Sequence, residues 1–292
     1  MNVAAQQLPL AGGVLLDHIS HFVPDLGAAA RALSALGFAV TPESAQQTQD
    51  GPAGSSNVCV MLERGYLEIL APTADTLNAR NLRSWMDRYP GVHLCCFGTP
   101  DAEGEQRRLQ AHGFNPPELV HLSREIEGLT ARFSVVRASR DRMPEGRIQY
   151  VQHFTPEALW RPRHLHHSNG VVKLACLFVV ADDPVAAAAR WAQFAALLPR
   201  PAGAFVHLPT ARGHVLIGRR QSWAGLLGDA PPAPGLAGYA LECRDTAALV
   251  SRCELSGLAL RRIRSDLYAT SLPDALGSSL MFGTRQGLGL SP

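Results

Sequence analysis

The sequence predicts an α+β fold made of four copies of a βαβββ unit, in which a strand and a helix are followed by further strands. Three observations lead to this prediction. An apolar strand-like run followed by a helix-like segment begins four times along the 292 residues, near positions 14, 91, 171 and 235. Each of these strands ends at an acidic residue that can cap the next helix. Apolar residues make up 46% of the chain, which is enough to fill a large core.

The first two units each show the expected order of elements. In the first unit, a strand at 14–23 leads into a helix at 25–36, which Gly37 ends, and three strands follow at 38–44, 57–63 and 66–72. In the second unit, a strand at 91–99 leads into a helix at 100–112, and strands follow at 116–122, 130–138 and 147–154.

The last two units repeat this order with shorter strands. The third has a strand at 171–180, an alanine-rich helix at 185–198 and strands at 204–210 and 213–220. The fourth has a strand at 235–243, a helix at 246–257 and strands at 259–266, 267–273 and 278–284.

The longest interruption of this pattern, at residues 158–170, predicts a linker. It is rich in His, Pro and Arg and has neither strand nor helix periodicity. We therefore expect one pair of units at 14–157 and a second pair at 171–287. The histidines at 164, 166 and 167 resemble a metal-binding tract, but their Pro, Ser and Asn neighbours favour a solvated linker.

Composition favours small-molecule or protein partners. The net charge is only +2 and the basic residues are dispersed, which argues against nucleic acid or an anionic membrane surface. No apolar stretch reaches the about 18 residues that a membrane span needs, and no signal peptide is evident. The six cysteines form no C-x-x-C pair, so we expect reduced core thiols and a cytoplasmic location.

Several short motifs resemble the vicinal oxygen chelate superfamily, and most closely its glyoxalase-like members. They are LLDHISHFVPDL at 15–26, LGF at 36–38, GYLEIL at 65–70, VQHFTPE at 151–157 and HHSNG at 166–170. The superfamily includes glyoxalase I, bleomycin-resistance proteins and extradiol dioxygenases. The resemblance implies that the four βαβββ modules pair into two curved mixed sheets. It also implies a metal on a concave face, held by the first and fourth strands of each unit.

Carried over by position, the resemblance predicts His18, Glu68 and His93 as metal ligands. Imidazole and carboxylate groups suit a divalent ion such as Zn, Ni, Fe or Mn. Gln152 takes the remaining fourth-strand position, and we assign the catalytic roles to Glu68 and Gln152. Gln152 departs from the glutamate of glyoxalase I and cannot accept a proton at neutral pH, which weakens that particular activity. A metal-free alternative stays open, because a single strand histidine is more often a hydrogen-bonded core residue.

Strand alternation sorts the remaining candidates. His21 lies on the opposite face of its strand from His18, and we expect it to be structural. The predicted substrate pocket consists of Tyr66, Cys95, Phe97 and His153.

Two functions follow from these expectations. The first is a metal-dependent lyase, isomerase or dioxygenase acting on a small oxygen-rich substrate. The second is a metal-free protein that binds or sequesters a small molecule, as bleomycin-resistance proteins do. The C-terminal pair has no ligand set at matching positions, so it serves as a cover for the first pair or as the contact of a homodimer.

Overall fold

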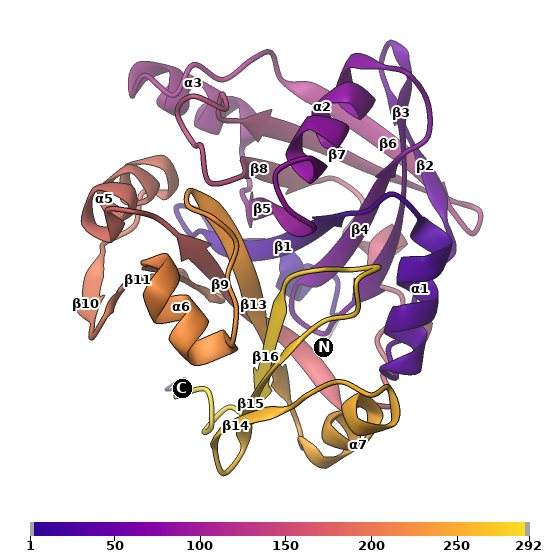
Figure 1. Ribbon diagram of the computed structural model, residues 1–292. Coiled ribbons are helices and arrows are strands. Elements are labelled where there is room, and N and C mark those ends of the chain that lie inside the picture. The colour runs from indigo at the N-terminus through magenta and orange to yellow at the C-terminus, as the bar shows by residue number, and fades with distance from the viewer. Residues whose placement is uncertain (1–2, 290–292) are drawn as a thin grey trace.

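The structure is a computed structural model that describes residues 3–289. Sixteen strands form a closed barrel in the N-terminal half and an open sheet in the C-terminal half (Figure 1). The strand order is β1-β4-β3-β2-β6-β7-β8-β5 in the barrel and β10-β11-β12-β9-β13-β16-β15-β14 in the open sheet. The predicted α+β fold of four paired βαβββ units is confirmed.

The N-terminal elements occur in the expected order, with a short 3₁₀-helix (η1) and one α-helix (α2) in addition. They are η1 (Ala5–Gln7), β1 (Leu15–Phe22), α1 (Leu26–Ala35), β2 (Ser44–Thr48), β3 (Gly51–Met61), β4 (Tyr66–Pro72), α2 (Leu77–Met86), β5 (Gly91–Gly98), α3 (Ala102–Ala111), β6 (Val120–Ile126), β7 (Leu129–Arg137) and β8 (Arg147–His153).

The C-terminal elements follow the same plan. They are α4 (Pro156–Leu159), η2 (Pro162–His164), β9 (Val171–Val180), α5 (Pro184–Ala195), β10 (Arg200–Ala202), β11 (Phe205–Pro209), β12 (His214–Gly218), α6 (Arg220–Leu227), β13 (Gly235–Cys243), α7 (Ala247–Leu255), β14 (Arg261–Arg264), β15 (Leu267–Ser271) and β16 (Ser279–Gly283).

A short strand that the sequence misplaced closes the barrel. We expected the second strand at 38–44, but β2 starts at Ser44 and pairs with β6 through Gln47 opposite Ser123 and Thr48 opposite Leu122. Residues 51–56, expected as a loop, belong to β3 and pair with β2 and β4. Gly and Pro are uncommon in strands, so the composition of this stretch gave no strand signal.

Helix α2 was not predicted, because its sequence LNARNLRSWM is largely polar. It buries a narrow face made of Ala79, Leu82 and Trp85, which recur every three residues. The Thr76 side chain caps it by accepting a hydrogen bond from the Ala79 N–H at 3.1 Å. Among the helices of residues 3–289, none is long and apolar enough to cross a membrane.

The strand-to-helix junctions are built as the sequence predicts. The side chains of Asp25, Asp101 and Asp183 each accept a hydrogen bond from a backbone N–H in the first turn of the following helix. Asp245 accepts one from the Ala247 N–H at 3.1 Å. The acidic residue is therefore the N-cap of the helix in three units, and in the fourth it directly precedes the N-cap Thr246.

The barrel and the open sheet share one hydrophobic core. The outer face of β1 and β5 packs toward β9 and β13, so that Ile19 and Phe97 belong to the same buried cluster as Leu177. The six cysteines are buried and free, as predicted. The C-terminal sheet therefore covers an apolar face of the barrel.

His21 joins the two halves through hydrogen bonds. Its Nδ1 lies 2.9 Å from the Leu276 carbonyl oxygen, and its Nε2 lies 3.2 Å from the Tyr239 hydroxyl. The ring is fully buried. His21 is thus a structural residue on the outer face of β1.

The segment at 158–170 is not the solvated linker that its composition suggested. His164 and His167 are buried, although His166 is exposed. His167 accepts a hydrogen bond from the Ala39 N–H at 3.0 Å, and its Nε2 lies 2.8 Å from the Met61 carbonyl oxygen. The segment is fastened to the barrel because its histidines supply partners for backbone groups.

Candidate functional site

The barrel encloses a polar chamber of about 30 Å³. Eight polar side chains border it: His18, Gln46, Tyr66, Glu68, Arg124, Arg137, Arg147 and Gln149. A larger cleft of about 390 Å³ lies between β2, the start of α2 and residues 118–122. Gln46, Leu122, Arg137 and Arg147 border both spaces, so the cleft leads to the chamber.

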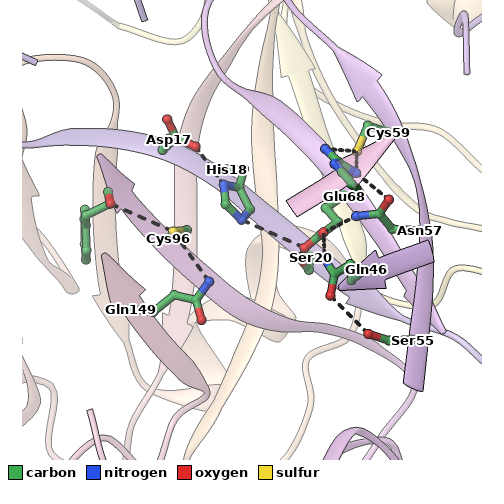
Figure 2. A network of polar contacts seen from close by, with 12 residues as sticks. Asp17, His18, Ser20, Gln46, Ser55, Asn57, Cys59, Glu68, Cys96 and Gln149 are labelled. Carbon is green, nitrogen blue, oxygen red and sulfur yellow. Dashed lines mark hydrogen bonds and ion pairs between the residues drawn. The ribbon is translucent and has the colours of Figure 1, made fainter. Parts of the chain in front are cut away.

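The imidazole of His18 is held by Asp17, its neighbour in β1 (Figure 2). Its Nδ1 lies 2.7 Å from Asp17 Oδ1, and its Nε2 faces Glu68 Oε2 at 3.9 Å. The ring stacks on Tyr66 at a centroid distance of 4.3 Å. A carboxylate can only accept, so Nδ1 carries a proton and Nε2 is the atom presented to the chamber.

Asp17 is fully buried and also accepts a hydrogen bond from His153 Nε2 at 3.2 Å. Burial by itself raises the pKa of Asp17, but the charges and hydrogen bonds of His153 and His18 outweigh it and hold the pKa far below its usual range. Asp17 is therefore ionised and fixes the orientation of both imidazoles.

Glu68 lies in a dense hydrogen-bond network (Figure 2). It accepts hydrogen bonds from the Ser20 hydroxyl, from Gln46 Nε2 at 3.2 Å and from Asn57 Nδ2 at 2.5 Å. Burial raises the pKa of Glu68, but the charges of His18 and Arg124 and the hydrogen bonds from Ser20 and Asn57 lower it below the ordinary value. The carboxylate is thus charged at neutral pH.

Arg124 is linked to Glu68 through Asn57. The Arg124 guanidinium donates to the Asn57 side-chain oxygen, while the Asn57 amide donates to Glu68. Arg124 also contacts Cys59 Sγ at 3.5 Å. A buried cation and a buried anion therefore share one bridging side chain.

The predicted ligand His93 does not reach the chamber. Leu94 borders the chamber instead, and His93 packs among Phe22, Trp85 and Tyr89, donating from Nε2 to the Tyr89 carbonyl oxygen at 2.7 Å. The prediction paired His18 with the wrong residue of β5. His18 lies seven residues before the capping Asp25, and the seventh residue before the equivalent Asp101 is Leu94.

Gln152 is likewise outside the chamber. Its side-chain oxygen accepts a hydrogen bond from the Ala102 N–H at 3.0 Å, at the start of α3. Gln149 takes the position that corresponds to Glu68, because Glu68 is opposite Ser20 and Gln149 is opposite Cys96 in the matching strand pairs. A sequence signal exists for this: Glu68 and Gln149 each follow a glycine, Gly65 and Gly146, by three residues.

Of the four predicted pocket residues, one borders the chamber and three do not. Tyr66 borders the chamber, as expected. Cys95 and Phe97 lie on the outer face of β5 in the core shared with the open sheet, where Phe97 contacts Trp191 and Phe194. His153 lies behind His18 against Trp160 and Asp17 rather than in the wall. The prediction was wrong for Cys95 and Phe97 because it set the strand register one residue off. It was wrong for His153 because it did not allow for the hydrogen bond of this ring to Asp17.

The arginines of the chamber were missed. Arg124, Arg137 and Arg147 lie on β6, β7 and β8, which form the half of the barrel opposite His18 and Glu68. The sequence signal is strongest at Arg137, which lies between Val136 and Ala138 at the end of an apolar run. Such a residue needs a partner when buried.

A family model for the glyoxalase-like domain matches residues 16–195, which is more than half of the chain. The chain belongs to the glyoxalase-like domain family. No curated protein matches the sequence.

Solved structures with low sequence identity share this glyoxalase-like fold. A hypothetical protein from Staphylococcus aureus superposes with a TM-score of 0.62 at 11% identity, covering 93% of this chain and 99% of the other. A triple mutant of 4-hydroxymandelate synthase from Streptomyces coelicolor gives 0.56 at 14% identity, covering 94% of each chain. A Mn(II)-bound glyoxalase from Novosphingobium aromaticivorans gives 0.57 at 9% identity, covering 92% of this chain and 81% of the other.

The donor set of the chamber does not fit a divalent metal centre. Among the described side chains that border the chamber, only His18 and Glu68 are strong metal ligands. Leu94 and Gln149 occupy the matching positions of the second unit. Within residues 3–289, no group of three or more His, Cys, Asp or Glu side chains is arranged to hold a metal. Glu68 already accepts three hydrogen bonds, and three arginine cations border the same space.

Proposed function

We propose that the N-terminal barrel binds a small organic molecule through its own side chains, without a resident metal. The observation that carries this proposal is the continuity of the cleft with a chamber in which polar groups converge. The cleft has the volume of an ordinary small-molecule site. The chamber, at about 30 Å³, accepts only a terminal group or one or two water molecules.

Blocking the cleft tests this proposal. Val120 lies in the cleft wall and is partly exposed, so we expect Val120→Trp to remove small-molecule binding while the barrel stays folded. Val185→Trp is the matched control, because Val185 is an exposed residue of α5 away from the cleft. Binding is followed by ligand-observed NMR with a fragment library. Equal binding by the wild type and Val120→Trp would contradict the proposal.

Elemental analysis separates this function from the metal-dependent lyase, isomerase or dioxygenase. Protein purified without a histidine tag should contain Zn, Ni, Fe and Mn well below one equivalent, and added ions should not raise its Tm. A stoichiometric metal that is lost in His18→Ala would overturn the metal-free proposal and favour the metal enzyme.

Proton transfer is a second candidate activity, favoured by the Asp17–His18 pair. Asp17 fixes the imidazole so that Nε2 faces the chamber, where it can remove a proton from a carbon next to a carbonyl group. Arg137 and Arg147 lie at the junction of the chamber with the cleft and can stabilise the resulting negative oxygen there.

Isotope exchange measures this activity directly. In D₂O, the wild type should speed the loss of the proton next to the carbonyl of small 2-oxo acids, as followed by NMR. His18→Gln should reduce this exchange by about 10²-fold or more, which is the usual contribution of a general base. His166→Gln, a change at an exposed histidine, should leave it unaltered. Exchange at the buffer rate with the wild type would remove this candidate.

A further inference from the structure

Two arginines at the junction of the cleft and the chamber lack an acidic partner. Arg137 donates from Nε to Gln149 Oε1 at 3.1 Å, and Arg147 donates to Asn78 Oδ1 at 2.8 Å. Both of these partners are neutral amides. Neither arginine forms an ion pair with a carboxylate of residues 3–289, whereas ten other arginines in that range do.

The two guanidinium groups oppose each other electrostatically. Burial lowers the pKa of Arg137 to about 10 and lowers the pKa of Arg147 well below its ordinary value, with the positive charge of Arg137 lowering it further. Glu68 attracts both arginines without contacting either. Glu118 and Asp50 border the cleft, but both are exposed and neither pairs with them. The site thus holds uncompensated positive charge.

From this geometry we infer that the cleft takes a small organic anion, whose carboxylate or phosphate group lies between Arg137 and Arg147. This inference rests on the proposed function and specifies its ligand class. A guanidinium offers a planar fork of N–H donors that suits both oxyanions, and the donors not used by Gln149 and Asn78 remain available.

Glu68 sets the orientation of such a ligand. Its carboxylate is ionised inside the chamber, so a second negative charge there would be repelled. The anionic group therefore stays beside Arg137 and Arg147, and the end that enters the chamber is neutral. The ligand class is a monofunctional organic anion rather than a molecule with negative charge at both ends.

Three probes with the same phenyl ring test the inference: benzoate, phenyl phosphate and benzamide, which is the neutral match of benzoate. At matched ionic strength, either or both of the anions should bind the full-length wild type with a Kd at least tenfold below that of benzamide, as measured by calorimetry. The comparison of benzoate with phenyl phosphate shows which oxyanion the site prefers. Arg147→Gln should weaken binding of the preferred anion at least tenfold, and Arg147→Lys should restore part of it.

The Tm of the ligand-free protein separates an anion site from a structural role. Because Arg147→Gln relieves the repulsion between two cations, its ligand-free Tm should equal or exceed that of the wild type. If Arg147 had a structural role, Arg147→Gln would instead lower the Tm of the ligand-free protein. Arg264→Gln removes an exposed arginine of β14 and should behave as the wild type in both measurements.

Two results would overturn the inference. One is the absence of binding by both anions. The other is equal affinity for benzoate and benzamide with no effect of Arg147→Gln. If benzamide binds and Val120→Trp abolishes that binding, the proposed small-molecule function stands although the anion preference is wrong.

Discussion

Replacing Glu68 with glutamine should lower the free energy of unfolding by about 3–5 kcal/mol, which is the usual cost of removing one partner of a buried pair of opposite charges. The change leaves the buried Arg124 without the anion that Asn57 connects to it. It also sets a new NH₂ group among donors from Ser20, Gln46 and Asn57, each of which needs an acceptor. Urea unfolding at pH 7 measures the loss as a lower midpoint with an unchanged m value.

A double-mutant cycle shows whether the two charges are coupled. Glu68→Gln combined with Arg124→Gln removes both charges, so its loss should be smaller than the sum of the two single losses by about 1–3 kcal/mol. Glu125→Gln is the matched control, because Glu125 is exposed and adjoins Arg124 on β6. It should change the free energy of unfolding by less than about 0.5 kcal/mol. Additive single losses would show that Glu68 and Arg124 act independently.

The element order of this chain could be predicted because its signals are local. Each capping aspartate lies next to the strand and helix that it joins, and the apolar runs carry their own periodicity. Elements without such signals were missed or misplaced. Helix α2 buries only a narrow face, and β2 acquires its place from pairing with β3 and β6.

The site could be predicted only in part because it depends on strand register. A shift of one residue moves a side chain to the other face of a strand, which is the difference between Leu94 in the chamber and His93 outside it. His18, Tyr66 and Glu68 border one chamber because they belong to one unit with a clear turn at Gly65. Whether an arginine has an acidic partner depends on residues far away in the chain. The positive charge at the chamber therefore could not be predicted from the sequence.

Acidification should begin to destabilise the protein well above the pKa range of carboxylates, because buried histidines, among them His21 and His93, are held neutral. Burial lowers the pKa of both His21 and His93 to about 4. His21 uses both ring nitrogens to join the barrel to Leu276 and Tyr239. His93 has one nitrogen bonded to the Tyr89 carbonyl, while its Nδ1 is buried without a partner in the described part of the chain. Protonation would add a charge that neither environment compensates.

The pH window follows from the lowered pKa values. Between pH 6.5 and about 4, the unfolded chain binds protons at these positions and the folded chain does not, so stability is complete above pH 6.5 and falls as the pH decreases. These two groups contribute a slope of up to about 2.7 kcal/mol per pH unit. His167, His207 and His214, whose pKa values burial also lowers, add to it. The lowered pKa of Asp17 adds a further loss below its unfolded value near 3.8.

His21→Gln tests the origin of this slope. Glutamine has both a donor and an acceptor and does not titrate, so the variant should reduce the slope by about 1.4 kcal/mol per pH unit, the share of one proton. Urea unfolding at steps from pH 4.5 to 7.5 measures it, with His166→Gln as the control at an exposed histidine that should keep the full slope. A slope unchanged in His21→Gln would show that His21 takes up no extra proton on unfolding, which would contradict this origin of the pH dependence.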